Sequence, residues 1–396
     1  MTALQHISAA RESRTVQNIE AMTLLVIYHL RSVSSHGMWY MIGLAMRTCV
    51  DLGMHRKGHE HGLSRPVIQR RRLLFWCVYA LERTIAVSLG RPASISDKQI
   101  DVEFPSEIVD EDTSSSSGSG NRILLAIQLF KVRQIESRIH QSIYRVDKPL
   151  ELLRPKLDRL YEKLKTWWIS LPESHEISNA DMNYLQLHYN RVVRLLIQPF
   201  LSILPSSDPY YGLCLRAAGD ICQVHKRLHQ TPDYGHSFIS VQTVFVAGIT
   251  LLYGLWTQSQ AVWSVALADD IRACSLVLFV MGERAPWVRK FRDAFEMLVN
   301  AAMEKLQNGD SRLSEMAAAA QGQPKTTIES TSVNLQYGPA ASTNDFNRES
   351  SIGGRVMNDQ DDAWRMVIEL ANWIDQEEGS AVWMPDFELL QNLSGI

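Results

Sequence analysis

Residues 64–92, SRPVIQRRRLLFWCVYALERTIAVSLGRP, determine the fold that we expect. Ser64 is a favoured N-cap residue, and Pro66 suits the first turn of a helix. Apolar residues then recur every three or four positions to about Ile85, the spacing of one helix face. Gly90 and the proline two residues later predict where the helix ends. We therefore expect one long amphipathic helix.

The same helical spacing recurs along most of the chain, and the alternation typical of strands is nearly absent. Gly53 directly follows one such segment, at the position where a left-handed glycine commonly ends a helix. Further helices are expected at 15–33, 38–52, 123–143, 157–171, 185–197 and 238–256. The sequence thus predicts an all-α fold built around one large, irregular helical domain.

Composition divides the chain into three sections. Residues 1–307 hold nearly all of the helical periodicity and are expected to form the helical domain. Residues 308–360 have few large apolar side chains and are expected to form a disordered linker. Residues 361–396 are expected to form a short C-terminal helix with an acidic-hydrophobic tail. Within the first section, an acidic and Ser/Gly-rich stretch at 110–120 predicts a flexible loop.

The last section has two interpretations. Residues 360–396 interleave acidic residues with large apolar ones such as Trp373 and Phe387, a mixture suited to the groove of a partner protein. Alternatively, a helix at 362–375 docks back on the helical domain through an apolar face that includes Trp364. The sequence favours neither interpretation over the other.

Charge and cysteine content limit the class of protein. The formal net charge is −3 and the pI is about 6.5, so the chain lacks the basic surface of an autonomous DNA-binding domain. Its five cysteines are odd in number and stand mostly among apolar helix positions. This pattern predicts reduced thiols and a compartment such as the cytosol or nucleus.

One segment is long and apolar enough to span a membrane. Residues 238–256 contain no charged side chain. The segment also contains polar residues, and it lacks flanking lysine or arginine. We therefore expect a buried core helix and no contact with a membrane.

A few clusters resemble catalytic or metal sites. His55, His59, Glu60 and His61 could together bind Zn²⁺, but they stand in a glycine-punctuated stretch without a helix-borne pair, which favours a solvated loop. The acidic pairs at 269–270 and 361–362 lack the further acid that a Mg²⁺ site requires. Glycine-rich phosphate loops and nucleophile elbows are also missing. We predict no catalytic residue, no cofactor and no metal ligand in this chain, and no enzymatic activity.

The densest basic run is Arg70, Arg71 and Arg72. Large apolar residues follow it at once, so the arginines are expected on the polar face of a half-buried helix. Carboxylates such as Glu82 or Asp97 are candidate partners for the last two arginines.

The motifs GxAxR at 43–47, LGxHR at 52–56, RRxxFW at 71–76 and LGRP at 89–92 follow one another in this order. Together they resemble the signature of the fungal-specific transcription factor domain, the middle homology region of zinc binuclear-cluster (Zn2Cys6-type) regulators. The matching signature residues are Gly43, Arg47, Leu52, Gly53, His55, Arg56, Arg71, Arg72, Phe75, Trp76, Gly90, Arg91 and Pro92. Weaker similarity extends the resemblance over roughly 16–303. Gln198 and Glu82 depart from it, since Arg and Asp are usual at those positions.

The resemblance implies roles for the signature residues. The glycines would supply backbone geometry, Phe75 and Trp76 would pack in the core, and Arg47, Arg72 and Arg91 would fix loops to helix ends. These roles are structural or regulatory rather than catalytic.

The resemblance also implies a function. We expect a pathway-specific regulator of transcription in the nucleus, which acts through inducer sensing or through intramolecular restraint of activation. The zinc cluster of the family is not in this sequence, so residues 1–307 are expected to be an N-terminally incomplete regulatory domain. DNA would be reached through a missing N-terminal module or a partner factor, and the tail would contact the transcription machinery. A small-molecule inducer is a further expected partner.

The alternative interpretation comes from a different class. An all-α enzyme, or a small-molecule binding protein without a role at DNA, would have the same composition and helical periodicity. A metal-dependent activity or a tightly copurifying ligand would favour this alternative.

Overall fold

The computed structural model describes residues 14–31, 37–106, 117–172, 178–229 and 237–320. Within these ranges the chain forms α-helices and short 3-10 helices, and none of the described residues is in a strand. The predicted all-α class is therefore confirmed.

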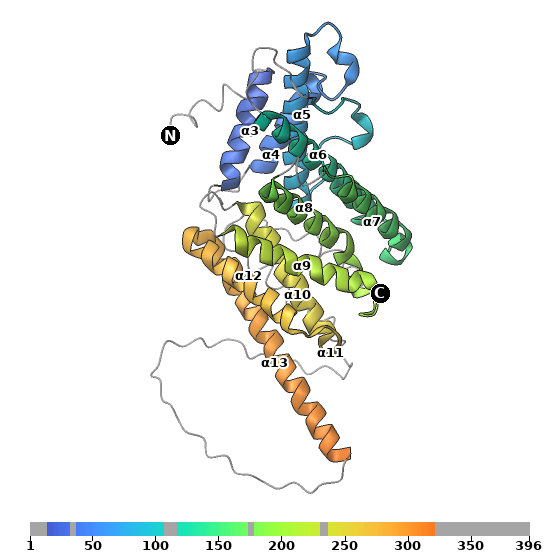
Figure 1. Ribbon diagram of the computed structural model, residues 1–396, viewed down its shortest axis with the longest axis vertical. Coiled ribbons are helices and arrows are strands. Elements are labelled where there is room, and N and C mark those ends of the chain that lie inside the picture. Colours follow the sequence, from blue (N-terminus) through green and yellow to red (C-terminus); the bar gives the residue numbers. More distant parts are fainter. Residues whose placement is uncertain (1–13, 32–36, 107–116, 173–177, 230–236, 321–396) are drawn as a thin grey trace.

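The helices follow one another as an elongated stack (Figure 1), from α3 at one end to α13 at the other. The α-helices are α3 (Val16–Arg31), α4 (Met38–Asp51), α5 (Arg65–Ser88), α6 (Ser117–Ile143), α7 (Arg154–Ile169), α8 (Asn179–Ile197), α9 (Pro209–Leu228), α10 (Phe238–Thr257), α11 (Ser259–Val262), α12 (Val265–Arg284) and α13 (Arg289–Ala320). The 3-10 helices are η1 (Lys57–Glu60), η2 (Asp97–Gln99), η3 (Leu150–Leu153), η4 (Gln198–Ser202) and η5 (Pro286–Val288).

Helices α3, α4 and α5 and the loop at 89–106 form what we call the N-terminal layer. Its core contains the apolar faces of α3, α4 and α5, with Ile19, Ile42 and Phe75 fully buried. Phe130 of α6 and Phe238 of α10 complete this core, and so connect the layer to the rest of the molecule. The amphipathic spacing of the sequence therefore places one apolar face of each helix against the others.

Helices α4 and α5 end in the same way, as the sequence predicts. Gly53 and Gly90 have φ angles of +66° and +58°, in the left-handed region that favours glycine. Each glycine N–H donates to the carbonyl three residues earlier, and the next N–H donates to the carbonyl five residues earlier, over 2.8 to 3.2 Å. This pair of hydrogen bonds is the Schellman motif, which satisfies the last carbonyls of a helix. At the start of α5, Pro66 lies in the first turn, while the Ser64 side chain makes no capping bond.

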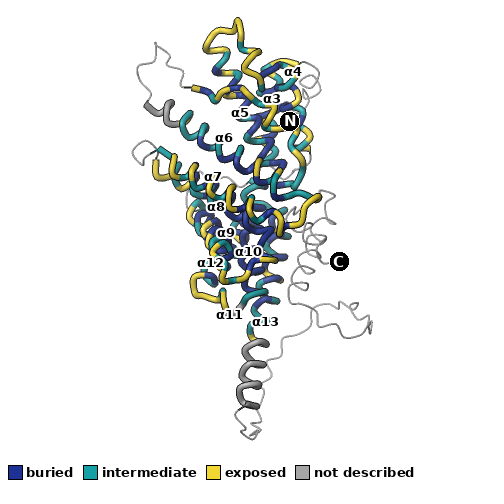
Figure 2. The backbone as a smooth tube through the Cα atoms, turned by 90° about the vertical axis from the view of Figure 1, so that its right-hand side faces the viewer, coloured by how far each residue is buried: buried dark blue, intermediate teal, exposed yellow. Residues whose placement is uncertain are grey.

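The second core lies in the C-terminal bundle, which we define as α7 to α10 with α12 and α13. Helix α10 runs through its middle, and Figure 2 shows it as a nearly continuous buried segment. It is the one described helix that is long and apolar enough to cross a membrane, and 89% of its most apolar window is buried inside the protein. A Cβ atom on Gly248 would lie 2.4 Å from Cys274 Sγ and 2.5 Å from Phe295 Cε2, so α12 and α13 approach α10 closely. The expectation of a buried core helix is confirmed.

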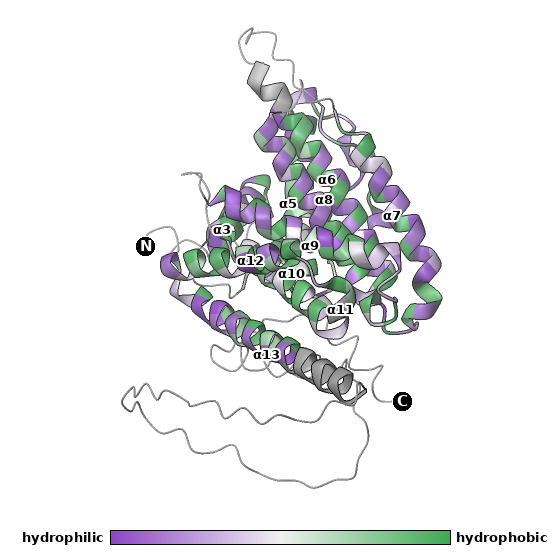
Figure 3. Ribbon diagram, turned by 60° about the horizontal axis from the view of Figure 1, so that its bottom comes forward, coloured by the Kyte–Doolittle hydropathy of each residue, from purple (hydrophilic) through white to green (hydrophobic). Residues whose placement is uncertain are grey.

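Two predicted boundaries differ from the structure. Helix α6 begins at Ser117, inside the loop predicted at 110–120, and α13 continues to Ala320, inside the linker predicted at 308–360. Residues 316–320 are methionine and alanine, strong helix formers that extend an existing helix at little cost. Figure 3 shows polar and apolar residues mixed along α13, where Phe291 and Phe295 are buried. The section 361–396 lies outside the described residues, so the three-part division stays a prediction.

Candidate functional site

The signature residues gather where α4 and α5 meet the loop at 89–106. Arg72 is central to this region, since its side chain is only 10% exposed and lies between two carboxylates. Its Nε and Nη2 donate to Glu60 at 2.6 Å each, and its Nη1 lies 3.0 Å from Glu103 Oε2. Arg71 instead donates to the carbonyl of Leu52 at 2.6 Å. Both arginines therefore attach a loop to α5.

The predicted pairing of these arginines with Glu82 or Asp97 is wrong. Residue 82 lies ten positions beyond Arg72, which is about 15 Å along a helix and too far for an ion pair. Both carboxylates belong to Arg83, which is 1% exposed. Arg83 forms an ion pair with Glu82 and lies 3.0 Å from Asp97 Oδ1.

Further groups complete what we call the Arg83 cluster. The Asp97 carboxylate accepts hydrogen bonds from Tyr79 Oη at 2.8 Å and from Ser137 Oγ at 2.7 Å. The Arg83 guanidinium also donates to the carbonyl of Ile95 at 2.6 Å. Four points of contact thus fix the loop at 89–106 against α5 and α6. The sequence signal for this cluster is an Arg–Glu pair on the inward face of an amphipathic helix.

Trp76 and Phe75 fill the space beneath these ion pairs. Trp76 is 2% exposed, and its Nε1 donates to the carbonyl of Glu103 at 2.9 Å. Its ring lies 4.5 Å from that of Phe104 and 6.0 Å from that of Phe130, between centroids. The contacts of both residues are those of packing residues, as the sequence predicts.

The LGxHR segment is connected to the same loop. The carbonyl of His55 accepts N–H bonds from Asp101 and Val102, both at 3.2 Å, and Arg56 lies 3.2 Å from the Asp101 carboxylate. Burial, and then the charge of Arg56, lower the pKa of His55 below its usual value. At the other end of the loop, the Arg91 guanidinium lies over the ring of Trp39, 4.9 Å from its centroid.

Other signature residues lie nearby without such bonds. A Cβ atom on Gly43 would come within 3.4 Å of Ser94 Oγ and 3.6 Å of the Arg47 guanidinium, so the loop passes close to α4 at this point. Pro92 follows Arg91 and lines a pocket beside α6. The regulatory share of the signature stays a prediction.

Two residues of the histidine cluster near η1 make structural contacts. Glu60, its only carboxylate, is held by Arg72, and the ring of His59 lies against Gly53. Among the residues that the structure describes, no group of three or more His, Cys, Asp or Glu side chains is placed to hold a metal ion.

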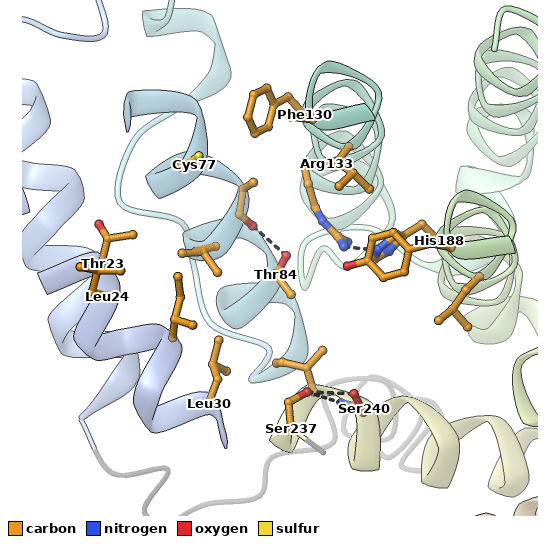
Figure 4. A pocket seen from close by; sticks show the side chains of 18 of the residues that line it. Thr23, Leu24, Leu30, Cys77, Thr84, Phe130, Arg133, His188, Ser237 and Ser240 are labelled. Atoms are coloured by element: carbon orange, nitrogen blue, oxygen red, sulfur yellow. Dashed lines mark hydrogen bonds between the residues drawn. The ribbon is translucent and has the colours of Figure 1, made fainter. Parts of the chain in front are cut away.

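A cavity that the sequence did not predict lies between the two cores. It has a volume of about 850 Å³ and is lined by α3, α5, α6, α8 and the start of α10, together with His225 of α9 (Figure 4). Its walls are mainly apolar, with residues such as Leu81, Leu129 and Phe130. Leu24 and Ile27 of α3 lie at the rim and are 67% and 41% exposed. The cavity therefore opens to solvent beside α3.

Buried charges form one end of this cavity, and we call them the Arg133 cluster. Glu136 of α6 is fully buried, forms an ion pair with Arg133, and lies 3.3 Å from Arg191 of α8. Burial alone would raise the pKa of Glu136, but the two arginines lower it below its usual value. Arg191 also donates to Ser88 Oγ at 3.1 Å. Two guanidinium groups therefore share one carboxylate.

His188 completes the Arg133 cluster. Its Nδ1 lies 2.9 Å from Arg133 Nη2, and Figure 4 shows the two side chains meeting across the cavity. Burial, followed by the charges of Arg133 and Arg191, lowers the pKa of His188 well below its usual value, so the imidazole is neutral. Because a guanidinium can only donate, Nδ1 accepts, and the proton is on Nε2. That Nε2 is buried and has no hydrogen-bond partner among the described atoms.

Comparison with known proteins gives a family match for part of the chain. Residues 2–169 match the fungal specific transcription factor domain. An uncharacterized transcriptional regulatory protein of Saccharomyces cerevisiae is 32% identical over 77% of this chain and 25% of its own length. Pyrimidine pathway regulatory protein 1 of the same yeast is 26% identical, over 61% of this chain and 29% of its own. The positive regulator of purine utilization of Emericella nidulans is 26% identical, over 73% and 35%.

The chain therefore spans about a quarter to a third of the length of these relatives. No solved structure is significantly similar to it. The sequence resemblance, carried by motifs between 43 and 92, is confirmed because those motifs lie inside the matched range. By this match, residues 2–169 of the chain are similar to the fungal specific transcription factor domain, and the matched relatives are named as fungal regulators of transcription.

Proposed function

We propose that this chain is the regulatory domain of a fungal regulator of transcription and that it acts in the nucleus. The family match and the names of the relatives support this function. DNA would be contacted by a part of the protein outside this chain, or by a partner factor, because the chain has a net charge of −3. The relatives named for pyrimidine and purine pathways support control of one metabolic pathway.

We further propose that the domain responds to a small molecule, and the cavity is the observation that carries this step. Its volume of about 850 Å³ falls in the range of roughly 300 to 1,000 Å³ that is usual for small-molecule sites. An occupant would contact α3 and α5 of the N-terminal layer together with α8 and α10 of the C-terminal bundle. A ligand that prefers one arrangement of these two parts would shift the population toward it.

A reporter experiment tests the proposed function. The full chain is fused to a heterologous DNA-binding domain in yeast, and reporter output is compared across carbon and nitrogen sources. We expect output that depends on the nutrient source. Ala126→Phe, which places a ring in the cavity, should abolish that dependence. Arg138→Phe adds the same ring to an exposed position of α6 and should behave like the parent fusion.

Two results would count against the proposal. One is a reporter that the fusion never affects in any medium. The other is an Ala126→Phe fusion that is folded and responds to nutrients as the parent does, because the cavity would then have no part in the response.

The section 360–396 is a second candidate for partner contact, and it rests on composition alone. Its acidic and large apolar residues suit an activation segment. Fusion of 360–396 to the DNA-binding domain should raise reporter output above that of the DNA-binding domain alone. Unchanged output, together with a lower melting temperature when the segment is deleted from the full chain, would favour docking on the helical domain.

A further inference from the structure

The Arg133 cluster carries more positive charge than its surroundings neutralise. Arg133 and Arg191 are 6% and 8% exposed, and the buried carboxylate they share is Glu136. Burial lowers the pKa of Arg191 to about 10, although Glu136 acts in the opposite direction. One carboxylate therefore offsets only part of the cost of burying two guanidinium groups.

The cluster also has a donor with no acceptor. His188 is 7% exposed and lines the cavity, and its Nε2 has no partner among the described atoms. A buried N–H without an acceptor costs more than an ordinary hydrogen bond contributes. An oxygen acceptor inside the cavity would remove this cost.

Several other polar groups that line the cavity have partners. Thr23 and Thr84 donate to carbonyls of their own helices, at 2.6 and 2.7 Å. At the rim, Arg70 lies 2.9 Å from Glu20, so these two charges offset each other. The surplus positive charge and the His188 Nε2 donor are both at the Arg133 end of the cavity.

We propose that the ligand of this cavity is an amphipathic organic acid, with one carboxylate at the Arg133 end and an apolar body along α3, α5 and α6. This proposal rests on the proposed function of the cavity. The carboxylate accepts from His188 Nε2 and adds the negative charge that Arg133 and Arg191 lack. Charge-assisted hydrogen bonds of this kind are roughly twice as strong as neutral ones. The apolar walls disfavour a ligand with several charges, because each further charge would be desolvated without a partner.

Calorimetric titration of the full chain tests the proposal with three probes that share one apolar body: decanoate, 1-decanol and decylamine. At pH 7.5 we expect decanoate to bind at least ten-fold more tightly than 1-decanol, and decylamine to bind more weakly than both. This comparison needs no variant, so it does not depend on the folding of a mutated chain.

Variants then locate the binding site of the acid. Arg191→Met keeps a similar volume and leaves Arg133 and Glu136 as a neutral pair, so decanoate should lose its advantage while 1-decanol binding stays. Arg138→Met removes the same charge from an exposed position of α6 and should leave the ratio unchanged. Ala126→Phe should weaken all binding, because it fills the shared cavity.

The outcomes separate the two proposals. If decanoate and 1-decanol bind equally and Ala126→Phe abolishes the binding of both, the proposal that the ligand is an organic acid is contradicted. The cavity would remain a ligand site. Tighter binding of decylamine would also overturn the acid. Binding of none of the probes would overturn the acid as well as the ligand-binding role of the cavity. An acid preference that survives in Arg191→Met would show that the carboxylate binds elsewhere.

Discussion

The two buried ionic clusters both use helix α6, and they differ in how far their polar atoms are satisfied. In the Arg83 cluster, the Asp97 carboxylate accepts from Arg83, Tyr79 and Ser137, and it is 22% exposed, so its surplus charge is near solvent. In the Arg133 cluster, two guanidinium groups share a fully buried carboxylate, and His188 Nε2 has no described partner.

This difference separates a structural role from a binding role. A cluster whose donors and acceptors are all paired stabilises one arrangement of the chain and has no need for an additional group. A cluster with surplus buried charge and an unpaired donor is costly when empty, and a ligand can remove that cost. Buried charges alone therefore do not mark a site, whereas unsatisfied buried charges beside a cavity do.

The largest effect is expected when the satisfied cluster loses its cation. Arg83→Met leaves Glu82 and Asp97 without the guanidinium that they share, and breaking a buried ion pair costs about 3 to 5 kcal/mol. The loss is a large part of typical domain stability, so urea denaturation should show a partly or fully unfolded protein. The exposed pair of Arg70 and Glu20 is the control, and Arg70→Met should change the unfolding free energy by less than about 1 kcal/mol. If Arg83→Met is as stable as Arg70→Met, the proposed structural role of the Arg83 cluster is contradicted.

Trp76→Ala measures the apolar packing beneath the same cluster. Removal of a buried tryptophan ring costs about 3 to 5 kcal/mol, so the variant should be insoluble or should melt far below the wild type. Trp76→Phe keeps a ring against Phe104 but loses the hydrogen bond to the Glu103 carbonyl, and it should be clearly milder. A Trp76→Ala protein that melts like the wild type would contradict the packing role.

The Arg133 cluster and His225 of α9, which is buried and lines the same cavity, together predict a pH dependence of stability. The folded-state pKa values of His188 and His225 lie below 6.5, with that of His225 lowered to about 3 by burial. Below pH 6.5 the unfolded chain therefore binds more protons than the folded chain, so stability falls as the pH falls. Each histidine contributes a slope of at most about 1.4 kcal/mol per pH unit, or roughly 2 kcal/mol between pH 6.5 and 5.

Urea midpoints measured from pH 7.5 to 5 check this slope. His225→Phe should flatten it by the share of one histidine, whereas His61→Asn, at an exposed position of the chain, should leave it unchanged. A wild-type stability that stays level across this pH range would show that neither histidine is buried in the neutral form.

The smallest effect concerns the turn that positions the loop of the Arg83 cluster. Gly90→Ala forces a left-handed conformation on alanine and should cost about 1 to 2 kcal/mol. Gly212→Ala is the matched control within helix α9, where an added Cβ meets its nearest described neighbour at 3.8 Å. That change should be neutral or slightly stabilising, because alanine is the better helix former. Thermal melting of both variants gives the comparison, and an unaffected Gly90→Ala would contradict the strain.

The sequence predicted the features that depend on neighbouring residues. The ends of α4 and α5 follow from Gly53 and Gly90, since a helix cap is a local structure. The partners of Arg72 could not be predicted, because Glu60 of η1 and Glu103 of the loop at 89–106 lie in segments whose positions depend on tertiary packing. The family signature was recognised for the same local reason, and its residues proved to surround the loop rather than the cavity.

The cavity could not be predicted from the sequence. Its walls come from helices far apart in the sequence, and the bond from Arg191 to Ser88 joins residues 103 positions apart. A signal was nevertheless present, because α8 carries a histidine and two arginines among its buried residues. Charged residues on a buried face are rarely there without a partner, so such a pattern marks a helix to inspect for a site.

Helix α6 contributes residues to both clusters. Glu136 and Ser137 are adjacent in sequence, yet the first belongs to the Arg133 cluster and the second to the Arg83 cluster. Successive residues of a helix point about 100° apart, so α6 presents these two side chains in different directions from one backbone. If α6 rotates about its axis, the distance from Glu136 to Arg191 and the distance from Ser137 to Asp97 change together. Binding in the cavity and the position of the loop at 89–106 are then coupled through the rotation of α6.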